Sequence, residues 1–295
     1  MTNFQDILLT QTQIEEIEQA DIIYRSTDLE KLATQIESDI LNNRYGLFSI
    51  LPVSPDICKF NNIIRVTINR TVTVDGSNKR LSKIENLKYP PVRIKHKLGY
   101  NRASFKNQSI FYGGFGDFQG LFENPPSTGD LFTISTWKQK DNSALCYVSI
   151  FHDRFVQERT NEFINDWNHY MEQLSYLDPN KRGAIEKLFS LITFFFTRPV
   201  DENKKIEYLF SSHISNKIFD LKFTPKIEAI LYPSVPMKFI SSNIAILPDA
   251  FDEKFTFLKA EEFIVLQNVK GKNQWISAKL GEAISSDNDN LNWEN

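Results

Sequence analysis

The first forty or so residues carry apolar side chains at three- and four-residue steps, which is the spacing of one face of a helix. From Asp6 to about Asn43, these residues are Ile7, Ile14, Ile17, Leu29, Leu32, Ile36 and Ile40. They stand among acidic and amide residues, so the pattern predicts two amphipathic helices with a break near residues 21–25. We assign residues 1–45 to an N-terminal helical segment that packs against the rest of the protein.

After Tyr45 the pattern changes to short β-branched runs punctuated by Gly, Pro and Asn, which is typical of strands. The predicted strands are 63–68, 109–112, 131–137, 145–151, 229–232, 243–247 and 262–268. A short helix is expected to begin near Asp117 and to end before Pro125-Pro126. The long loop 75–97 contains Pro90-Pro91 and is where we expect flexibility or a substrate lid.

Between the two groups of strands, from residue 154 to 219, the apolar spacing is again helical. Asp178-Pro179 forms a cap and first turn for one helix, and Asp201 is the predicted start of another that runs to Ile218. Strands on both sides of a helical block, without regular strand–helix alternation, predict an α+β fold with a mixed sheet. We therefore assign 46–282 to one domain with a helical insertion at about 154–219, and the polar residues 283–295 to a disordered tail.

Composition limits what the protein is expected to bind. Hydrophobic residues make up 41% of the 295 residues, including 24 Phe and 10 Tyr, which is ample for a core. The formal net charge is −3, and basic residues form only short runs such as Lys79-Arg80, so no nucleic acid partner is expected. Cys58 and Cys146 are the only cysteines and no Cys/His cluster is present, so we expect no metal.

The same patterns bear on localisation. The N-terminus has no basic segment followed by an apolar stretch, as a secretory signal requires. The longest apolar run, Leu188 to Thr197, is about half of the roughly 20 residues that cross a bilayer. We predict a cytoplasmic protein without a membrane partner.

Familiar catalytic signatures are missing, since there is no phosphate loop, no Gly-x-Ser-x-Gly elbow and no His-Glu-x-x-His helix. The run 111–116 (Phe-Tyr-Gly-Gly-Phe-Gly) lacks the third glycine and the βαβ length of a dinucleotide-binding loop. What remains is a spaced series of short motifs: Pro90-Pro91, Tyr100-Asn101-Arg102-Ala103-Ser104, Ser109-Ile110-Phe111-Tyr112-Gly113, Glu123, and Glu228 to Ser234 followed by Asn243.

This series resembles the RES family, which is named for its Arg, Glu and Ser. The likeness runs from about Ile63 to Pro248 and follows the family's order of a proline pair, a Gly-Arg-x-Asn turn, a strand ending in Tyr, a helix with Glu, and a Tyr-Pro-Ser turn before a strand that starts at Asn. The chain departs from this pattern at three places, where Asn101 replaces Gly, Ser104 replaces Asn, and Ser242 replaces Gly.

The resemblance implies a fold akin to the ADP-ribosyltransferases, with a split β-sheet core, and an enzyme that cleaves NAD between nicotinamide and ribose. NAD is then the substrate, phosphate or water is the acceptor, and the protein acts as a toxin or defence effector. The physical requirements can be stated independently: a carboxylate for the positive charge on ribose, a cation for the pyrophosphate, and an aromatic face for the departing ring.

Glu123 is our candidate for the carboxylate; without the resemblance, a solvated helical Glu would be the ordinary interpretation. Arg65 is the first candidate for the site cation, because a guanidinium within an apolar strand needs an anionic partner. A buried salt bridge would satisfy Arg65 equally well. Arg70 is the alternative site arginine.

Four further residues complete the candidate site. Arg102 either reaches a phosphate or braces its turn, and Tyr112 either stacks on nicotinamide or packs in the core. Ser234 is a candidate hydrogen-bond partner for the nicotinamide ribose or for Glu123. Asn243 is a candidate NAD-binding residue, although tying down the backbone at a strand start is the favoured interpretation.

Other function classes stay open at this point. One is an ADP-ribosyltransferase that modifies a macromolecule, and another is a catalytically inactive RES-like scaffold that binds a protein. In toxin–antitoxin pairs of this family the partner is a small helix-turn-helix antitoxin, so a protein antitoxin or regulator is a candidate partner. The sequence does not decide between a monomer and a homo-oligomer.

Overall fold

A computed structural model describes residues 55–73, 75–151, 161–200, 207–269, 274–287 and 289–294. The predicted N-terminal segment (1–45) and the predicted helix start at Asp201 lie outside the described residues. The described chain has a mixed α+β fold with ten strands and five α-helices, in which both parallel and antiparallel strand pairs occur. It divides into two compact units, which are described separately.

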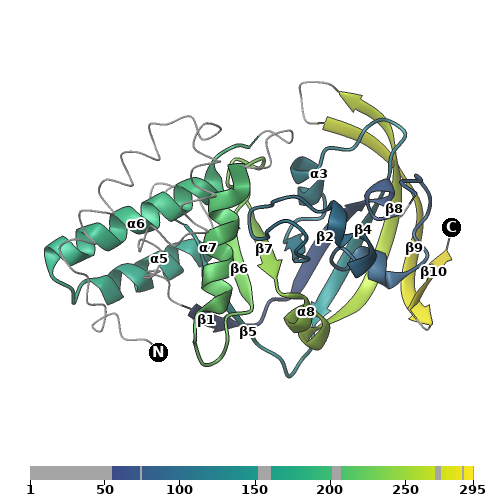
Figure 1. The fold of residues 1–295 in the computed structure, drawn as a ribbon. Helices are drawn as coiled ribbons and strands as arrows, with labels where there is room; N and C mark the ends of the chain where they lie inside the picture. The colour runs from purple at the N-terminus through teal and green to yellow at the C-terminus, as the bar shows by residue number, and fades with distance from the viewer. Residues whose placement is uncertain are drawn as a thin grey trace. The chain divides into compact units, whose positions relative to one another are not determined.

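Unit 1 contains residues 55–56, 99–106 and most of 146–235. Its strands β5 (Leu145–Ser149) and β6 (Ala229–Pro233) pair in parallel, and β1 (Pro55–Cys58) is next to β5. Three helices belong to this unit, as Figure 1 shows: α5 (Asn161–Leu174), α6 (Pro179–Thr197) and α7 (Leu209–Asp220).

The start of α6 confirms its sequence prediction. The Asp178 side chain accepts a hydrogen bond from the Asn180 backbone N–H, and Pro179 occupies the first turn. The Asp178 side chain thereby satisfies one of the backbone N–H groups that have no partner within the first turn of a helix. Proline has no backbone N–H, so Pro179 adds no unsatisfied donor. The apolar face of α6 is buried, and its Phe195 stacks on Phe210 of α7 with ring centroids 4.3 Å apart.

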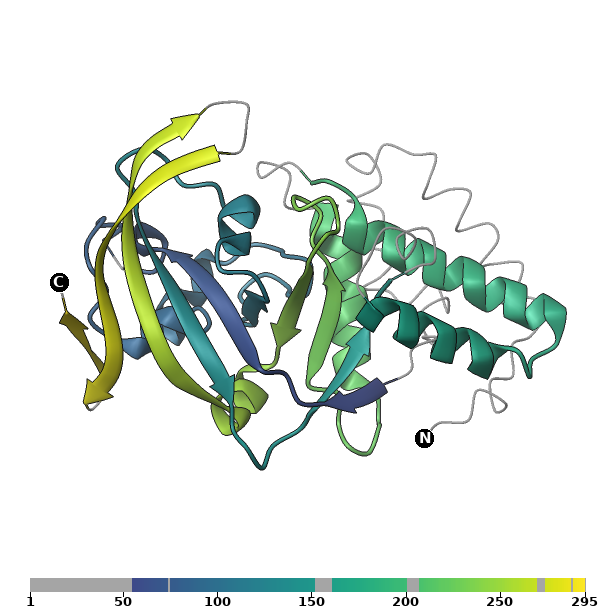
Figure 2. The ribbon, with the colours of Figure 1, turned by 180° about the vertical axis from the view of Figure 1, so that it is seen from behind.

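Unit 2 contains residues 57–98, 107–145 and 236–295. Its described strands form an antiparallel sheet in the order β7-β3-β2-β4-β8-β9-β10. The strands are β2 (Asn62–Ile68), β3 (Phe111–Gly114), β4 (Leu131–Gln139), β7 (Ser242–Ile246), β8 (Phe255–Val269), β9 (Gln274–Asp287) and β10 (Asn290–Glu294). Figures 1 and 2 both show β8 and β9 as a long pair beside β4. Its helices are α3 (Gln119–Glu123) and α8 (Pro248–Lys254).

The sheet of unit 2 has two buried faces, because successive side chains of a strand point to opposite sides. On the α3 face, Leu121 packs in a cluster with Ile68, Phe132, Ile134 and Val265. On the α8 face, Phe251 lies against two rings, with centroid distances of 3.9 Å to Phe111 and 4.9 Å to Trp137. Each candidate residue on a strand of unit 2 can therefore be assigned to one face.

The segment 75–97, for which the sequence suggested flexibility or a lid, is packed in unit 2. It contains the short 3-10 helices η4 (Ile84–Leu87) and η5 (Val92–Lys97). Leu81, Ile84, Leu87 and Ile94 are buried. These apolar side chains give the segment a hydrophobic contact that the Pro and Gly content of the sequence did not reveal.

The prediction of a disordered tail over 283–295 was wrong for the described residues. β9 extends to Asp287, and β10 pairs with it from Asn290 to Glu294. Leu291 is buried, and the Trp293 indole N–H donates to the Leu81 carbonyl oxygen at 2.8 Å. The two apolar residues anchor an otherwise polar segment, whose backbone groups are satisfied by pairing with β9.

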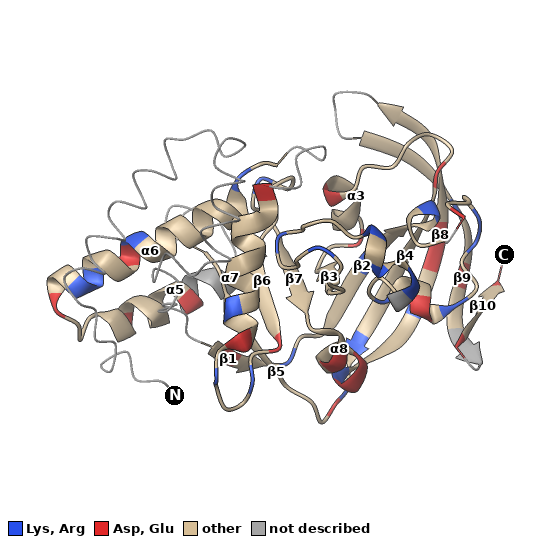
Figure 3. Ribbon diagram, viewed as in Figure 1, with Lys and Arg blue, Asp and Glu red and all other residues tan. Residues whose placement is uncertain are grey.

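Figure 3 shows acidic residues on α8, and β8 and β9 each carry both basic and acidic residues. Among the residues that the structure describes, no helix combines the length and the apolar character needed to span a bilayer.

Candidate functional site

Glu123 is the last residue of α3, the short helix on the α3 face of unit 2. The helix ends there because Asn124 is followed by Pro125-Pro126, and the residue before a proline is kept out of the helical conformation. Gly120 allows α3 to lie close to β2, since a Cβ atom at this position would be 2.6 Å from the Val66 Cβ. The position of Glu123 therefore follows from one glycine and one proline pair.

The half-buried Glu123 carboxylate accepts a hydrogen bond of 2.8 Å from the Asn243 side-chain Nδ2 at its Oε1. Asn243 lies on β7, and the two residues are 120 positions apart in the sequence. Both were selected from the sequence as site residues, and unit 2 brings them together. The favoured interpretation from the sequence, in which Asn243 ties down the backbone, does not account for this side-chain contact.

Gln119, at the first turn of α3, connects to the same pair. Its Nε2 donates to the Asn243 Oδ1 at 2.6 Å and to the Ser242 main-chain oxygen at 2.8 Å. Gln119 and Asn243 are only 4% and 7% exposed. Buried amides are expected to have such partners, since an unsatisfied polar group is costly inside a protein.

Tyr112 lies on β3 opposite Ala245 of β7, two residues before Gly114, which is opposite Asn243. Strand alternation therefore directs Tyr112 to the α3 face, the same face as Asn243 and Glu123. The Tyr112 side chain is half-buried. The predicted stacking of its ring on nicotinamide stays a prediction.

Arg65 lies on the opposite side of the sheet. It is on β2 opposite Ser135, and its guanidinium lies 5.7 Å from the ring centroid of Phe111, which belongs to the α8 face. Its Nη1 donates to the Tyr112 main-chain oxygen at 2.9 Å, whereas its buried Nε has no hydrogen-bond partner within the described chain. Burial lowers the pKa of Arg65 to about 10, so the group stays charged at neutral pH.

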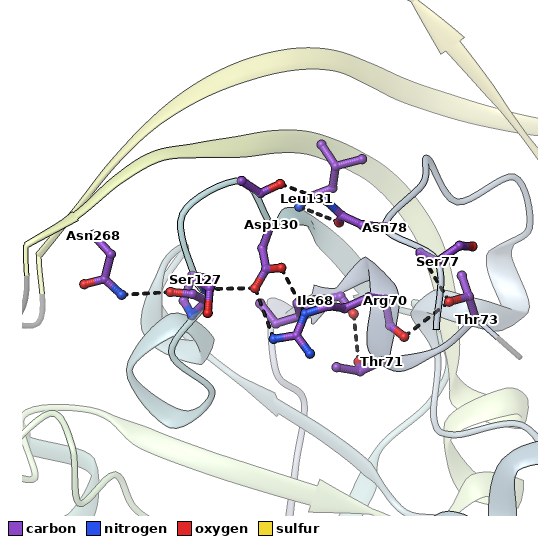
Figure 4. A network of polar contacts seen from close by, with 12 residues as sticks. Ile68, Arg70, Thr71, Thr73, Ser77, Asn78, Ser127, Asp130, Leu131 and Asn268 are labelled. Carbon is purple, nitrogen blue, oxygen red and sulfur yellow. Dashed lines mark hydrogen bonds and ion pairs between the residues drawn. The ribbon is translucent and has the colours of Figure 1, made fainter. Parts of the chain in front are cut away.

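The alternative arginine, Arg70, is fastened to a carboxylate (Figure 4). Its Nε and Nη2 donate to the two Asp130 oxygens at 2.9 and 3.2 Å. The Asp130 Oδ2 also accepts from the Ser127 backbone N–H at 2.8 Å. Burial raises the pKa of Asp130, but the hydrogen bonds from Arg70 and Ser127 outweigh it and the net shift is downward. This geometry favours Arg70 as a residue that joins the ends of β2 and β4.

Arg102 belongs to unit 1, where it is buried at the C-terminal end of α6. Its guanidinium donates to the main-chain oxygens of Phe196 at 2.8 Å and Arg198 at 2.9 Å. The last carbonyl groups of a helix lack partners within it, and a cation is favourable there. Of the two interpretations of Arg102, the structure favours the one in which it braces the chain.

Ser234 also belongs to unit 1 and directly follows β6. Its side chain is fully buried. The predicted turn at Asn101 to Ser104 is present in the same unit, where Asn101 and Ser104 exchange main-chain hydrogen bonds of 3.0 and 3.3 Å. The hydrogen-bond role of Ser234 toward ribose or Glu123 stays a prediction.

Three residues in α3 or just before it were missed in the sequence. Gln119 is one, and the others are Phe115 and Phe118, whose side chains are 39% and 45% exposed just before α3. The Phe115 backbone N–H points to the Gln119 Oε1 at a long 3.4 Å, and the Phe118 ring meets Phe263 edge-on at 5.9 Å. Exposed aromatic residues in a protein this rich in buried Phe were not distinguishable from core residues in the sequence.

The arrangement offers a half-buried carboxylate that accepts from a neutral amide, with the exposed ring of Phe118 at the other end of the same short helix. Comparison with known proteins adds no assignment: the chain matches no protein-family model, and no curated protein sequence matches it significantly.

Proposed function

We propose that this protein cleaves NAD at the bond between nicotinamide and ribose, with phosphate or water as the acceptor. The observation that carries the proposal is the 2.8 Å hydrogen bond between Asn243 and Glu123. The two residues come from distant motifs that were chosen for their order along the chain. Their direct contact supports a common site on the α3 face.

The chemistry of the bond cleavage suits a carboxylate held in this way. As nicotinamide leaves, positive charge develops on the ribose ring, and a fixed negative charge nearby lowers the barrier. Asn243 is neutral, so it orients the Glu123 carboxylate without cancelling its charge. In this proposal, Glu123 stabilises the developing charge and Asn243 positions Glu123.

A split sheet of the ADP-ribosyltransferase kind is part of the proposal. The β2–β3 ladder has a single register pair, Ile64 with Gly114, which supports a parting of these strands beyond that point. Arg65 follows Ile64, and its bond to the Tyr112 carbonyl links the parting strands. Arg65 thus helps to hold β3, while its contact with the NAD pyrophosphate stays a prediction.

Phe115 and Phe118 are proposed to supply the aromatic face for the nicotinamide ring. A flat apolar surface that is solvent-exposed in the free protein is suited to stack on such a ring. Phe118 is the N-cap residue of α3 and Glu123 is its last residue, so one short element carries both the ring and the carboxylate. A helix of this length spans roughly 7 Å, which is within the reach of a nicotinamide riboside group.

The test is to incubate the purified protein with NAD, with and without phosphate, and to measure released nicotinamide. We expect release by the wild type and its loss in Glu123→Gln. Glu253→Gln is the matched control, because Glu253 is an exposed glutamate of α8 in the same unit. Absence of nicotinamide release from the wild type, or equal rates for the wild type and Glu123→Gln, would contradict the proposal.

The acceptor is identified in the same experiment. Free ADP-ribose indicates water, and its phosphorylated form indicates phosphate. Label from NAD that becomes attached to a protein or nucleic acid would instead indicate the ADP-ribosyltransferase alternative.

A further inference from the structure

The direction of the Asn243 amide is decided by a chain of hydrogen bonds that begins at a main-chain carbonyl. The Ser242 oxygen can only accept, so the Gln119 atom 2.8 Å away must be the Nε2 donor. The same Nε2 lies 2.6 Å from Asn243, which therefore presents its Oδ1 there. The Asn243 Nδ2 is thus left to face Glu123 as a donor.

We infer that Gln119 is a positioning residue that holds the Asn243 amide in the one orientation that can donate to Glu123. An amide turned by half a rotation would place two oxygens, Oδ1 and the Glu123 carboxylate, against each other. Because Gln119 and Asn243 are buried, water does not compete for these bonds. The consequence for catalysis rests on the proposed function, whereas the amide direction does not.

The local sequence is arranged around the Gln119 side chain. A Cβ atom at Gly114 would lie 2.6 Å from the Gln119 Oε1 and 2.7 Å from its Cδ. Glycine at this position of β3 therefore leaves the volume that the amide occupies. The Gln119 amide cannot be pushed aside without giving up its bonds to Ser242 and Asn243.

The test replaces Gln119 by methionine, which keeps an unbranched side chain of similar length and removes the amide. Gln139→Met is the matched control. Gln139 is a fully buried amide of unit 2 that also serves main-chain groups, accepting from the Phe60 N–H at 2.8 Å and donating to the Ser143 oxygen at 3.2 Å. Both variants lose a buried amide, but only Gln119→Met loses the contact with Asn243.

The first readout is the NMR signal of the Asn243 side-chain NH2 group, compared with and without the additional substitution Glu123→Gln. In the wild type and in Gln139→Met, this signal is expected to shift when the Glu123 carboxylate is replaced by an amide. In Gln119→Met the shift is expected to fall to less than about half, because the amide is no longer held toward Glu123. The second readout is nicotinamide release, with kcat lowered about 10-fold in Gln119→Met and KM changed less than about 2-fold.

The inference is overturned if Gln119→Met keeps the wild-type NMR response, or if Gln139→Met alters that response and kcat to the same extent. A wild-type protein that releases no nicotinamide would remove the proposed function. The NMR comparison would still decide the role of Gln119, so the two failures can be told apart.

Discussion

Two regions of unit 2 hold carboxylates in different ways. On the α3 face, the half-buried Glu123 carboxylate is bound by the neutral amide of Asn243. Elsewhere in the unit, carboxylates are bound by arginines: Asp130 by Arg70 at 2.9 Å, and Glu262 by Arg80 at 2.7 Å. The first arrangement fixes the position of a carboxylate with a neutral group, and the second compensates its charge.

This difference distinguishes a carboxylate that is suited to bind a ligand from carboxylates that stabilise the fold. A buried charge with an opposite charge beside it is satisfied and contributes to folding, but has little left to offer a ligand. A carboxylate oriented by an amide keeps its negative charge for a developing cation. The same reasoning applies to the arginines, since Arg70 is paired with Asp130, whereas Arg65 has a buried Nε without a partner in the described residues.

The largest predicted effect concerns the site. Glu123→Gln is expected to lower kcat for nicotinamide release about 1000-fold, because the charge that stabilises the cation is removed. Its free energy of unfolding should change by less than about 1 kcal/mol, since a half-buried side chain is replaced by one of equal shape that can still accept the hydrogen bond from Asn243. Nicotinamide assays measure kcat, and urea denaturation measures the free energy of unfolding. A large loss of stability would instead indicate that Glu123 stabilises the fold, as Asp130 and Glu262 do.

Glu262→Gln is predicted to lower the stability of the protein and to leave kcat almost unchanged. Glu262 is 1% exposed and accepts from both Arg80 and Asn69, so its neutralisation takes the carboxylate charge away from a partly buried arginine. We expect a loss of about 2–3 kcal/mol in the free energy of unfolding, because breaking a buried ion pair is costly and Arg80 retains some access to water. The folded variant should keep its kcat within about 2-fold; urea denaturation and the nicotinamide assay measure both.

Two glycine variants test whether the position of the Gln119 amide affects kcat. Gly114→Ala is expected to displace the Gln119 amide and to lower kcat about 10-fold, since its Cβ would meet that amide at 2.6 Å. Gly116→Ala is the control, because a Cβ there would lie at ordinary contact distances of 3.7–3.8 Å from the same side chain. Equal kcat values for the two variants would count against a role of Gln119 in holding the site.

The smallest predicted effect is a pH dependence of the Arg70–Asp130 pair. The folded-state pKa of Asp130 lies below its ordinary value, so the pair stabilises the protein above about pH 4 and loses this contribution as pH falls through the folded-state pKa. Because Arg70 is 45% exposed, Asp130→Asn should cost only about 1 kcal/mol at pH 7. Urea denaturation of both proteins should show this difference at pH 7 and at pH 5, and a smaller one near pH 3; an unchanged difference near pH 3 would contradict the assignment.

Much of the fold was predictable from local patterns. The strand pattern at 63–68 matches β2, and that at 131–137 lies within β4. The cap at Asp178-Pro179 correctly marks the start of α6. These elements are determined by neighbours in the sequence. β10 was missed, since its strand conformation depends on pairing with β9 and on the burial of Leu291.

The candidate site divides in the same way. The sequence by itself determined which residue types were available and their order, including Glu123 on a helix that two prolines end and Asn243 at the start of a strand. Only the tertiary structure decided that Asn243 contacts Glu123, that Arg65 lies on the other face, and that Gln119 orients the pair. The reason is physical: helix and strand signals act over a few residues, whereas these hydrogen bonds join segments more than a hundred residues apart, and their geometry exists only once the sheet is assembled.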